Sequence, residues 1–241
     1  MVNNRKHNMS ALDLYLKKYY LNKVQFAAAC NCTATEIDTL IQAQLLPAPS
    51  YVVTENAKIF SAVFGEMDAA GTDAGEYFHP ANTVWYNKAQ AAIAAHGDQA
   101  AQVFRQNFMQ EFIDAITELN ATLWHVQDSF TSDGTVISAG LQTRADFAWQ
   151  HFLMGTFSLC VANPVSAAAI ARKEILQEKL GALTDHGNKR IYSTAEARDL
   201  LPLVDEYAQA AMWFSPAEYP RCSRKRLVDD LRPHLLAAIA A

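Results

Sequence analysis

A single apolar seam in the middle of the chain constrains the fold most strongly. Its large side chains recur at alternating intervals of four and three residues, at Phe108, Phe112, Ile116, Leu119, Leu123, Val126 and Phe130. These intervals place them on one face of a long helix, expected over residues 98–129, and so long a stripe needs other helices to cover it. Hydrophobic residues make up 51% of the chain, whereas only 9 of 241 residues are glycine and 8 are proline. This balance favours helices elsewhere too, and we predict an all-α protein.

Capping and turn residues divide the rest of the chain. Thr54 can cap a helix over residues 55–67, and the stretch 68–81, which is rich in Gly, Ala and Asp, is expected to be a loop. We predict two domains. A helix-turn-helix-like module with a short extended arm occupies residues 1–53, and a multi-helix bundle occupies residues 54–241.

The first of these domains has the pattern of two short helices, a tight turn and an arm. Phe26 belongs to the first helix and Ile37 to the second, and Asn31 between them tolerates the left-handed conformation that such a turn needs. The segment QLLP, residues 44–47, then resembles the GLLP segment of MerR-type regulators, in which a helix-turn-helix runs into a wing. The resemblance implies a helix-turn-helix fold and, less specifically, DNA binding.

The charges of this module argue against DNA binding. No Lys or Arg occurs between Val24 and Ala57, and the second helix exposes Glu36 and Asp38 where a reading helix carries cations. Neutralisation of phosphates dominates the affinity of proteins for DNA, so an acidic face opposes it. We therefore expect a structural or partner-facing module, and a MerR-like DNA-binding regulator is the less favoured alternative.

Composition excludes several broad classes. The net charge is -5, which gives no general polyanion-binding signature. No apolar run reaches the 18 residues that a membrane-spanning helix needs, and the N-terminal segment MVNNRKHNMS lacks the apolar core of a secretory signal. Four irregularly spaced cysteines favour reduced thiols, as in a cytoplasmic bacterial protein.

Common metal and cofactor motifs are absent from the sequence. Cys30 and Cys32 do not form a CxxC pair, and no neighbouring His or Cys pair completes a metal site, so we expect no metal. The GxSxG, P-loop, GxGxxG and HExxH motifs are also missing. We therefore expect no cofactor, and the sequence does not favour a standard hydrolase, NTPase or dinucleotide-dependent enzyme.

Two histidines are candidates for acid–base chemistry. His79 lies in an aromatic cluster, and His151 precedes Gly155, an unusual glycine inside an expected helix. The cluster around His79 either forms the wall of a ligand pocket or packs as a loop onto the bundle. The candidate ligand-binding residues are Tyr77, Phe78, Trp85 and Arg172.

A basic cluster at the start of the last expected helix is the candidate anion or partner site. It consists of Arg221, Arg224, Lys225 and Arg226. Cations at a helix N-terminus oppose the helix dipole unless an anion binds there or carboxylates neutralise them. The cluster therefore either binds a phosphate or an acidic partner, or forms a surface salt-bridge network with Asp229 and Asp230.

Four segments together resemble a known family. They are YLxKYYL at 15–21, LLPAPSYVV at 45–53, GTFSLCVANP at 155–164 and FSPAEYPRCSRKRLVDDLR at 214–232. They are similar to an uncharacterised bacterial family whose members are labelled as natural-product biosynthesis proteins of unknown function. The resemblance implies a setting in specialised metabolism, without catalytic residues to transfer.

These observations leave two main hypotheses for function. The first is an accessory protein of a bacterial natural-product pathway that binds an acidic carrier protein or a phosphorylated small molecule through the basic cluster. The alternative is an unusual, cofactor-independent enzyme of that pathway that uses His79 as acid or base.

Overall fold

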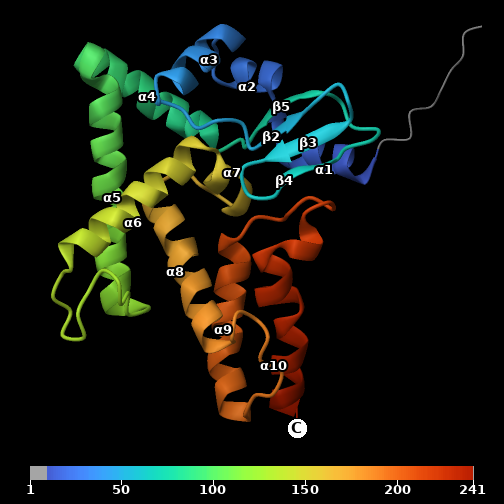
Figure 1. Cartoon of the computed structure of the whole chain (residues 1–241), viewed down its shortest axis with the longest axis vertical. Coiled ribbons are helices and arrows are strands. Elements are labelled where there is room, and N and C mark those ends of the chain that lie inside the picture. Colours follow the sequence, from blue (N-terminus) through green and yellow to red (C-terminus); the bar gives the residue numbers. More distant parts are fainter. Residues whose placement is uncertain (1–9, 241) are drawn as a thin grey trace, which may run out of the picture.

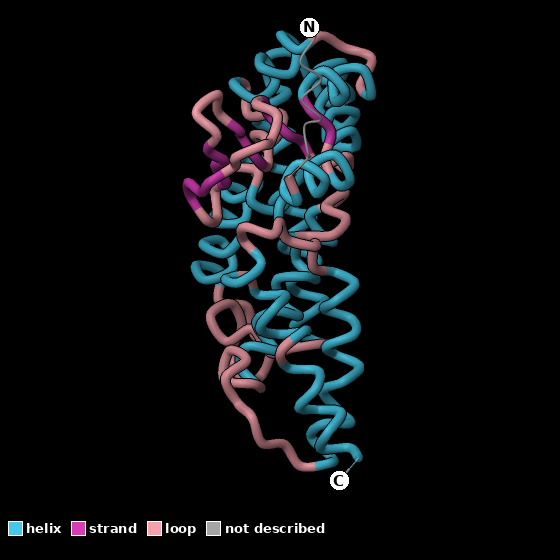
Figure 2. Tube along the Cα trace, turned by 90° about the vertical axis from the view of Figure 1, so that its right-hand side faces the viewer, coloured by secondary structure: helices cyan, strands magenta, loops and turns pink. Residues whose placement is uncertain are grey.

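The computed structural model describes residues 10–240, which form an elongated, mostly helical body (Figure 1). The first helices and all strands lie in the half of the molecule opposite the C-terminus (Figure 2). No helix among the described residues has the length and apolar character that a membrane span requires. The helices are α1 (Ala11–Tyr19), α2 (Lys23–Ala29), α3 (Ala34–Gln42), α4 (Asn82–His96), α5 (Ala100–Thr122), α6 (Ser138–Leu153), α7 (Thr156–Cys160), α8 (Ala167–Leu183), α9 (Thr194–Ala210) and α10 (Leu231–Ala240).

A five-stranded antiparallel sheet corrects the all-α prediction. Its order is β1-β5-β2-β3-β4. Residues 55–67, expected as a helix capped by Thr54, instead hold most of a hairpin, and the expected loop 68–81 contains a strand. The strands are β1 (Leu21–Asn22), β2 (Tyr51–Val53), β3 (Lys58–Ser61), β4 (Gly65–Asp68) and β5 (Gly75–Phe78).

The short length of these strands explains why they escaped prediction. In β3 the side chains alternate between the core and solvent, so that Ile59 is buried and Phe60 is exposed, but the alternation lasts only four residues. Such a run is too short to be distinguished from one turn of helix by its periodicity. Gly65 begins β4 with a φ of 70°, a conformation that glycine adopts without steric cost.

The predicted pair of short helices is present. Asn31 has a φ of 52° in the turn between α2 and α3, and Thr33 caps α3 in a capping box with Glu36. Phe26 and Ile37 are fully buried where the two helices meet the core. A helix-turn-helix in the functional sense stays a prediction.

The long helix is shorter than its apolar seam. The helical part of the seam, which includes Phe108 and Leu119, is buried as expected. Helix α5 ends at Thr122, however, and the last two seam residues, Val126 and Phe130, are buried from a turn-rich segment. The seam therefore predicts the core residues correctly but overestimates the length of the helix at its C-terminal end.

The N-terminal arm packs tightly onto the helical part at Gly155. This glycine separates α6 from α7 with a φ of 75°, and a Cβ atom placed on it would lie 2.6 Å from the carbonyl oxygen of Ala48. The amide of Ala48 donates a hydrogen bond to the carbonyl oxygen of Leu153 at 2.9 Å. One hydrophobic core accordingly continues from Leu12 in α1 to Cys222 near the chain's end, while a second lies between α8, α9 and α10.

We expect Gly155→Ala to destabilise the fold by roughly 2–4 kcal/mol, because it adds both left-handed strain and a collision with the arm. Gly134→Ala is the matched control, since Gly134 also has a positive φ, of 85°, but faces open space. Strain alone should cost the control roughly 1 kcal/mol. Urea denaturation measures both changes, and equal losses would show that the arm does not press on Gly155.

Candidate functional site

The predicted aromatic cluster is part of the sheet and the core. The hydroxyl of Tyr77 donates to the carbonyl oxygen of Asp73 at 2.8 Å, and Phe78 stacks on Phe26 with ring centroids 4.7 Å apart. Both predicted side chains are buried in β5. They form packing contacts at these positions, and ligand binding by them stays a prediction.

His79 follows β5 directly and is 6% exposed. Its Nδ1 accepts a hydrogen bond from the amide of Ala81 at 3.1 Å, and the ring also hydrogen-bonds the backbone of Ala162. Burial lowers the pKa of His79 to about 4, so the ring is neutral near pH 7. The geometry favours a role in joining the end of the sheet to the segment after α7, and the acid–base role stays a prediction.

The basic cluster divides into two cations that bond to other parts of the fold and two that are exposed. Arg224 is buried, donates to the carbonyl oxygens of Ala208 and Ala211 at 2.7 Å, and lies 3.7 Å above the ring of Trp213. Lys225 forms an ion pair with Asp230 at 2.6 Å. Both cations are thus already bonded within the protein, and neither is available to bind a partner.

Arg221 and Arg226, the other two members, are exposed. Arg221 ends a 3-10 turn at Tyr219–Arg221, and Arg226 lies in the π-helical turn Lys225–Asp229. Within residues 10–240, neither forms an ion pair with a carboxylate. The guanidinium of Arg221 lies 5.2 Å from the ring centroid of Phe64, which holds it over the mouth of a recess.

This recess is one of three neighbouring hollows beside α8, which we call arms and together the groove. Three hollows of about 270, 490 and 420 Å³ share Glu174 as a lining residue. We call the first the cationic arm; it is lined by Val63, Phe64, His151, Thr156, Phe157, Cys160, Lys173, Glu174, Gln177, Phe214, Arg221, Ser223 and Arg226. The second, the apolar arm, is lined by Phe112, Asp128, Ala139, Gly140, Thr143, Arg144, Phe147, Ala148, His151, Phe157 and Glu174. The third, the polar arm, is lined by Arg144, Glu174, Gln177, Glu178, Gly181, Ala182, His186, Arg226 and Leu227.

Lys173 places a positive charge in the wall of the cationic arm. It is 2% exposed, and its Nζ lies 2.8 Å from Glu174 and 3.7 Å from the Sγ of Cys160. Burial opposes the charge, whereas the adjacent carboxylate of Glu174 favours it, and the pKa of Lys173 is raised. Burial raises the pKa of the Cys160 thiol. The pair at neutral pH is therefore an ammonium ion beside a thiol, and neither group is a ready nucleophile.

The cationic arm has an excess of positive charge. Three cations line it, Lys173, Arg221 and Arg226, against the single carboxylate of Glu174. His151, the second predicted histidine, is exposed where the cationic and apolar arms meet, and its ring lies 6.1 Å from that of Phe157. The structure thus brings together His151 and two of the four predicted basic residues.

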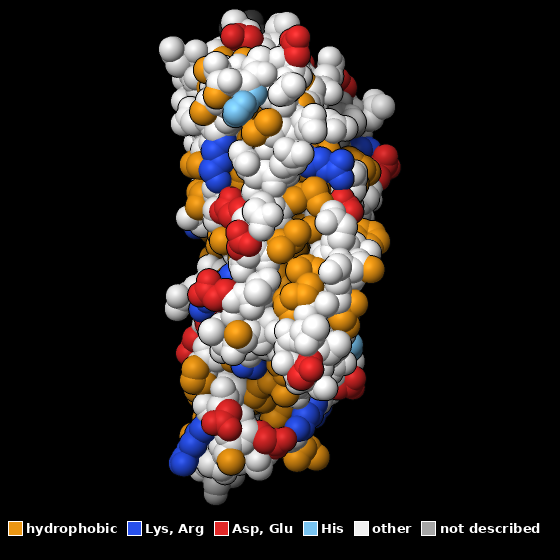
Figure 3. Space-filling model, turned by 90° about the vertical axis from the view of Figure 1, so that its left-hand side faces the viewer, with side chains coloured by type: hydrophobic (Ala, Val, Ile, Leu, Met, Phe, Trp, Pro, Cys, Tyr) orange, Lys and Arg blue, Asp and Glu red, His pale blue; other side chains and the backbone are white. Residues whose placement is uncertain are grey.

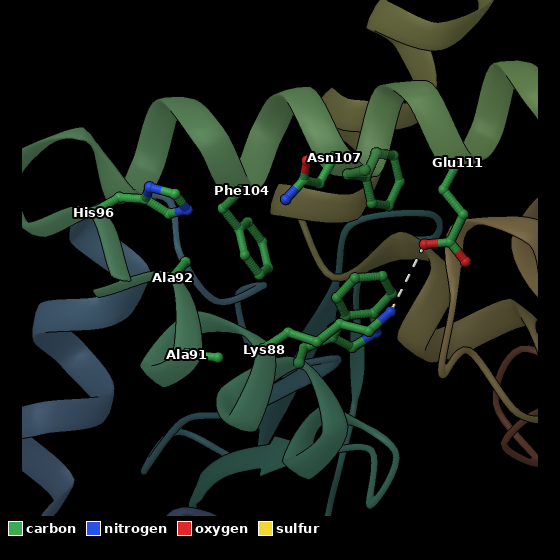
Figure 4. A pocket seen from close by; sticks show the side chains of 9 residues that line it. Lys88, Ala91, Ala92, His96, Phe104, Asn107 and Glu111 are labelled. Atoms are coloured by element: carbon green, nitrogen blue, oxygen red, sulfur yellow. Dashed lines mark ion pairs between the residues drawn. The ribbon is translucent and has the colours of Figure 1, made fainter. Parts of the chain in front are cut away.

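Arg172 and Trp85 lie away from this groove. Arg172 points to α9 and pairs with Glu206. Trp85 lies in the floor of a separate cavity of about 400 Å³ between α4 and α5. Figure 4 shows Lys88 from α4 reaching toward Glu111 on α5 across this cavity, with a separation of 3.7 Å. The Nζ of Lys88 also lies 4.3 Å from the centroid of the Trp85 ring. The cation that lines this cavity is therefore already paired with Glu111.

Lys173 is a charged groove residue that is not among the candidate site residues predicted from the sequence. A signal for it exists, because Lys173 follows Ile170 by three residues and precedes Leu176 by three, within the apolar stripe of α8. A cation in register with a buried stripe is expensive unless it is paired. Cys160 and Glu174, which complete its surroundings, come from positions that show no comparable pattern.

A family model described as a family of unknown function (DUF6058) matches residues 104–236, which is more than half of the chain. The chain belongs to this family. Neither a curated protein nor a solved structure matches it. Every residue that lines the three arms, apart from Val63 and Phe64, falls inside the DUF6058 segment. The groove is therefore built almost entirely by the part of the chain that defines the family.

The neutral, buried state of His79 predicts a loss of stability in mild acid. Its pKa falls from 6.5 to about 4 on folding, so below pH 6.5 the unfolded chain binds a proton that the folded chain does not. The stabilisation is complete above pH 6.5 and is lost toward pH 4, with roughly 2 kcal/mol gone at pH 5. Urea unfolding at pH 7 and pH 5 should show this loss in the wild type and a smaller one in His79→Asn.

His96→Asn is the control for this experiment, because His96 is exposed. It should retain the difference between the two pH values. If His79→Asn retained it as well, His79 would not be the group that titrates.

Proposed function

We propose that this DUF6058 protein binds a small phosphorylated molecule in the cationic arm and serves as an accessory protein of a bacterial natural-product pathway. The observation that carries the proposal is the convergence of Arg221, Arg226 and the buried Lys173 on one recess. The pathway setting rests on the resemblance of its four sequence segments to a family with that label.

The chemistry of the recess supports phosphate as the anionic group. A guanidinium presents paired N–H donors that match phosphate oxygens, and an ammonium adds a compact charge. Lys173 keeps its charge although it is almost fully buried. Burying a charged lysine costs free energy, and the single carboxylate of Glu174 compensates only part of that cost. A bound anion would compensate a further part.

The same geometry favours a small molecule over an acidic carrier protein. A carrier protein would need an exposed basic face, but Arg224 is buried and Lys225 is paired with Asp230. Arg221 and Arg226, which form no ion pair among the described residues, line a recess with the rings of Phe64 and Phe214, and Arg226 also donates to the carbonyl oxygen of His186 at 3.3 Å. A recess with aromatic and cationic walls suits a small ligand better than a flat protein surface.

Binding is also better supported than catalysis. A nucleophilic cysteine needs a lowered pKa, whereas burial raises the pKa of Cys160. A Schiff-base lysine needs to lose its proton, whereas the pKa of Lys173 is raised. Within the cationic arm this leaves His151 as the exposed acid–base group, without a second group positioned to work with it.

Calorimetric titration with inorganic pyrophosphate tests the proposal. We expect one site per chain, with an affinity that falls as NaCl is added, because the exposed arginines are open to screening. Arg221→Ala and Arg226→Ala should each weaken binding by roughly tenfold or more, the typical value of a charge-assisted hydrogen bond.

Lys88→Ala is the matched control, since Lys88 is a cation that lines the separate cavity between α4 and α5. It should bind pyrophosphate like the wild type. Loss of binding in Lys88→Ala but not in the arginine variants would place the anion in the wrong cavity, and the absence of any heat with the wild type would refute the proposed function.

A further inference from the structure

We infer that the ligand is an amphiphile, with its phosphate in the cationic arm and an alkyl chain in the apolar arm. This inference rests on the proposed function and extends it to the part of the ligand that carries no charge. The two arms share His151, Phe157 and Glu174 as lining residues, so they are neighbours, and a ligand bound in one lies beside the other.

The apolar arm has the lining that a hydrocarbon chain requires. Phe112 and Phe157, which are buried, line it together with Phe147, Ala139 and Ala148 of α6. Its volume of about 490 Å³ is within the range of small-molecule sites. Across the wider face formed by α5 and α6, apolar side chains reach the surface between charged ones (Figure 3).

Phe147 is the clearest sign of an unfilled apolar surface. It lies on α6 at the apolar arm, and it is 63% exposed although it is a large aromatic side chain. The centroid of its ring lies 6.5 Å from that of His151, a residue that lines both arms. The exposed ring is therefore close to the place where the two arms meet. A chain that lies in the arm would cover this ring and exclude water from it.

The charged residues of the apolar arm are already neutralised, which leaves the anionic group to the other arm. Arg144 forms ion pairs with Asp128 and with Glu178, each at 2.8 Å. Glu174, at the junction, is paired with Lys173. A second anion would therefore find no free cation in the apolar arm, whereas a neutral chain would meet no unpaired charge there.

A series of monomeric alkyl phosphates tests the inference. Affinities of the full-length protein for inorganic phosphate, ethyl phosphate, butyl phosphate and hexyl phosphate are measured by calorimetry at one salt concentration. Each buried methylene should raise the affinity by roughly twofold to fourfold, so that hexyl phosphate binds at least about tenfold more tightly than ethyl phosphate. Phe147→Ser should flatten this rise.

Phe60→Ser is the matched control, because Phe60 is also a half-exposed phenylalanine, on β3, and does not line the groove. It should show the same rise as the wild type, and the melting temperatures of both variants verify that they fold. A rise that persists in Phe147→Ser and disappears in Phe60→Ser would overturn the assignment of the apolar arm.

The possible failures are distinguishable. If the wild type binds inorganic phosphate and all alkyl phosphates equally, the alkyl chain is excluded and the proposed phosphate site stands. If it binds none of them, both proposals fail. Vesicles of phosphatidic acid and phosphatidylcholine form a separate arm of the experiment, in which we expect no co-sedimentation. Co-sedimentation without binding of the monomeric phosphates would identify a membrane surface instead of a single amphiphile.

Discussion

The buried carboxylate of Glu218 holds the two halves of the molecule together. It is fully shielded from solvent and accepts hydrogen bonds from the hydroxyls of Tyr51 at 2.5 Å, Ser61 at 2.9 Å and Ser215 at 2.8 Å. Burial raises the pKa of Glu218, because the charged form loses its hydration. No cation contacts this group among the hydrogen bonds and ion pairs of the described residues. Three hydroxyl donors in fixed positions are thus what makes its burial tolerable.

The hydrogen bonds to Glu218 determine where the sheet lies on the helices. Tyr51 and Ser61 come from neighbouring strands, while Ser215 and Glu218 come from the segment after α9. The hydroxyl of Tyr15 extends the network from α1 by donating to the carbonyl oxygen of Trp213 at 2.6 Å. Loss of any one hydroxyl would leave part of a buried carboxylate unsatisfied, so the sheet and the C-terminal segment cannot shift independently.

This network also brings together four segments that are distant in the sequence, residues 15–21, 45–53, 155–164 and 214–232. Tyr15 and Tyr20 belong to the first segment, Tyr51 to the second, Ser158 to the third and Glu218 to the fourth. The hydroxyl of Tyr20 donates to the carbonyl oxygen of Ser158 at 3.4 Å, and its ring lies 5.1 Å from that of Tyr51. Segments that are separate in the sequence therefore meet at one buried polar cluster.

The sequence predicts those features that depend on neighbours a few residues apart. The seam through Phe108 and Phe112 and the left-handed turn at Asn31 follow from local spacing or local hydrogen bonds. The strands of the sheet do not, because each is too short for its alternation to be recognised. Strand β5 pairs with β1 and β2, which are distant in the sequence, and Glu218 bonds to Tyr51 and Ser61 over a still longer separation, so no local pattern reveals these contacts.

In the candidate site, too, some features can be predicted from local sequence and others depend on long-range contacts. Arg221 and Arg226 are recognisable as a basic cluster, but local sequence cannot tell that Arg224 between them is buried against Trp213. Arg221 follows Glu218 by three positions and ends the single 3-10 turn that begins at Tyr219, so the buried carboxylate anchors the backbone next to this arginine. The chain on one side of the recess is therefore held in place by Glu218.

The DUF6058 segment and the β3–β4 hairpin contribute differently to the two arms. The apolar arm is lined only by residues of the DUF6058 segment, whereas the cationic arm also takes Val63 and Phe64 from the β3–β4 hairpin. The amide of Phe64 donates to the hydroxyl of Ser61, which in turn donates to Glu218, so the hairpin wall is tied to the same network. The shape of the cationic arm therefore depends on the sheet as well as on the helices, whereas that of the apolar arm depends on the packing of helices and the loops between them. A change in the sheet should alter the cationic arm before it alters the apolar arm.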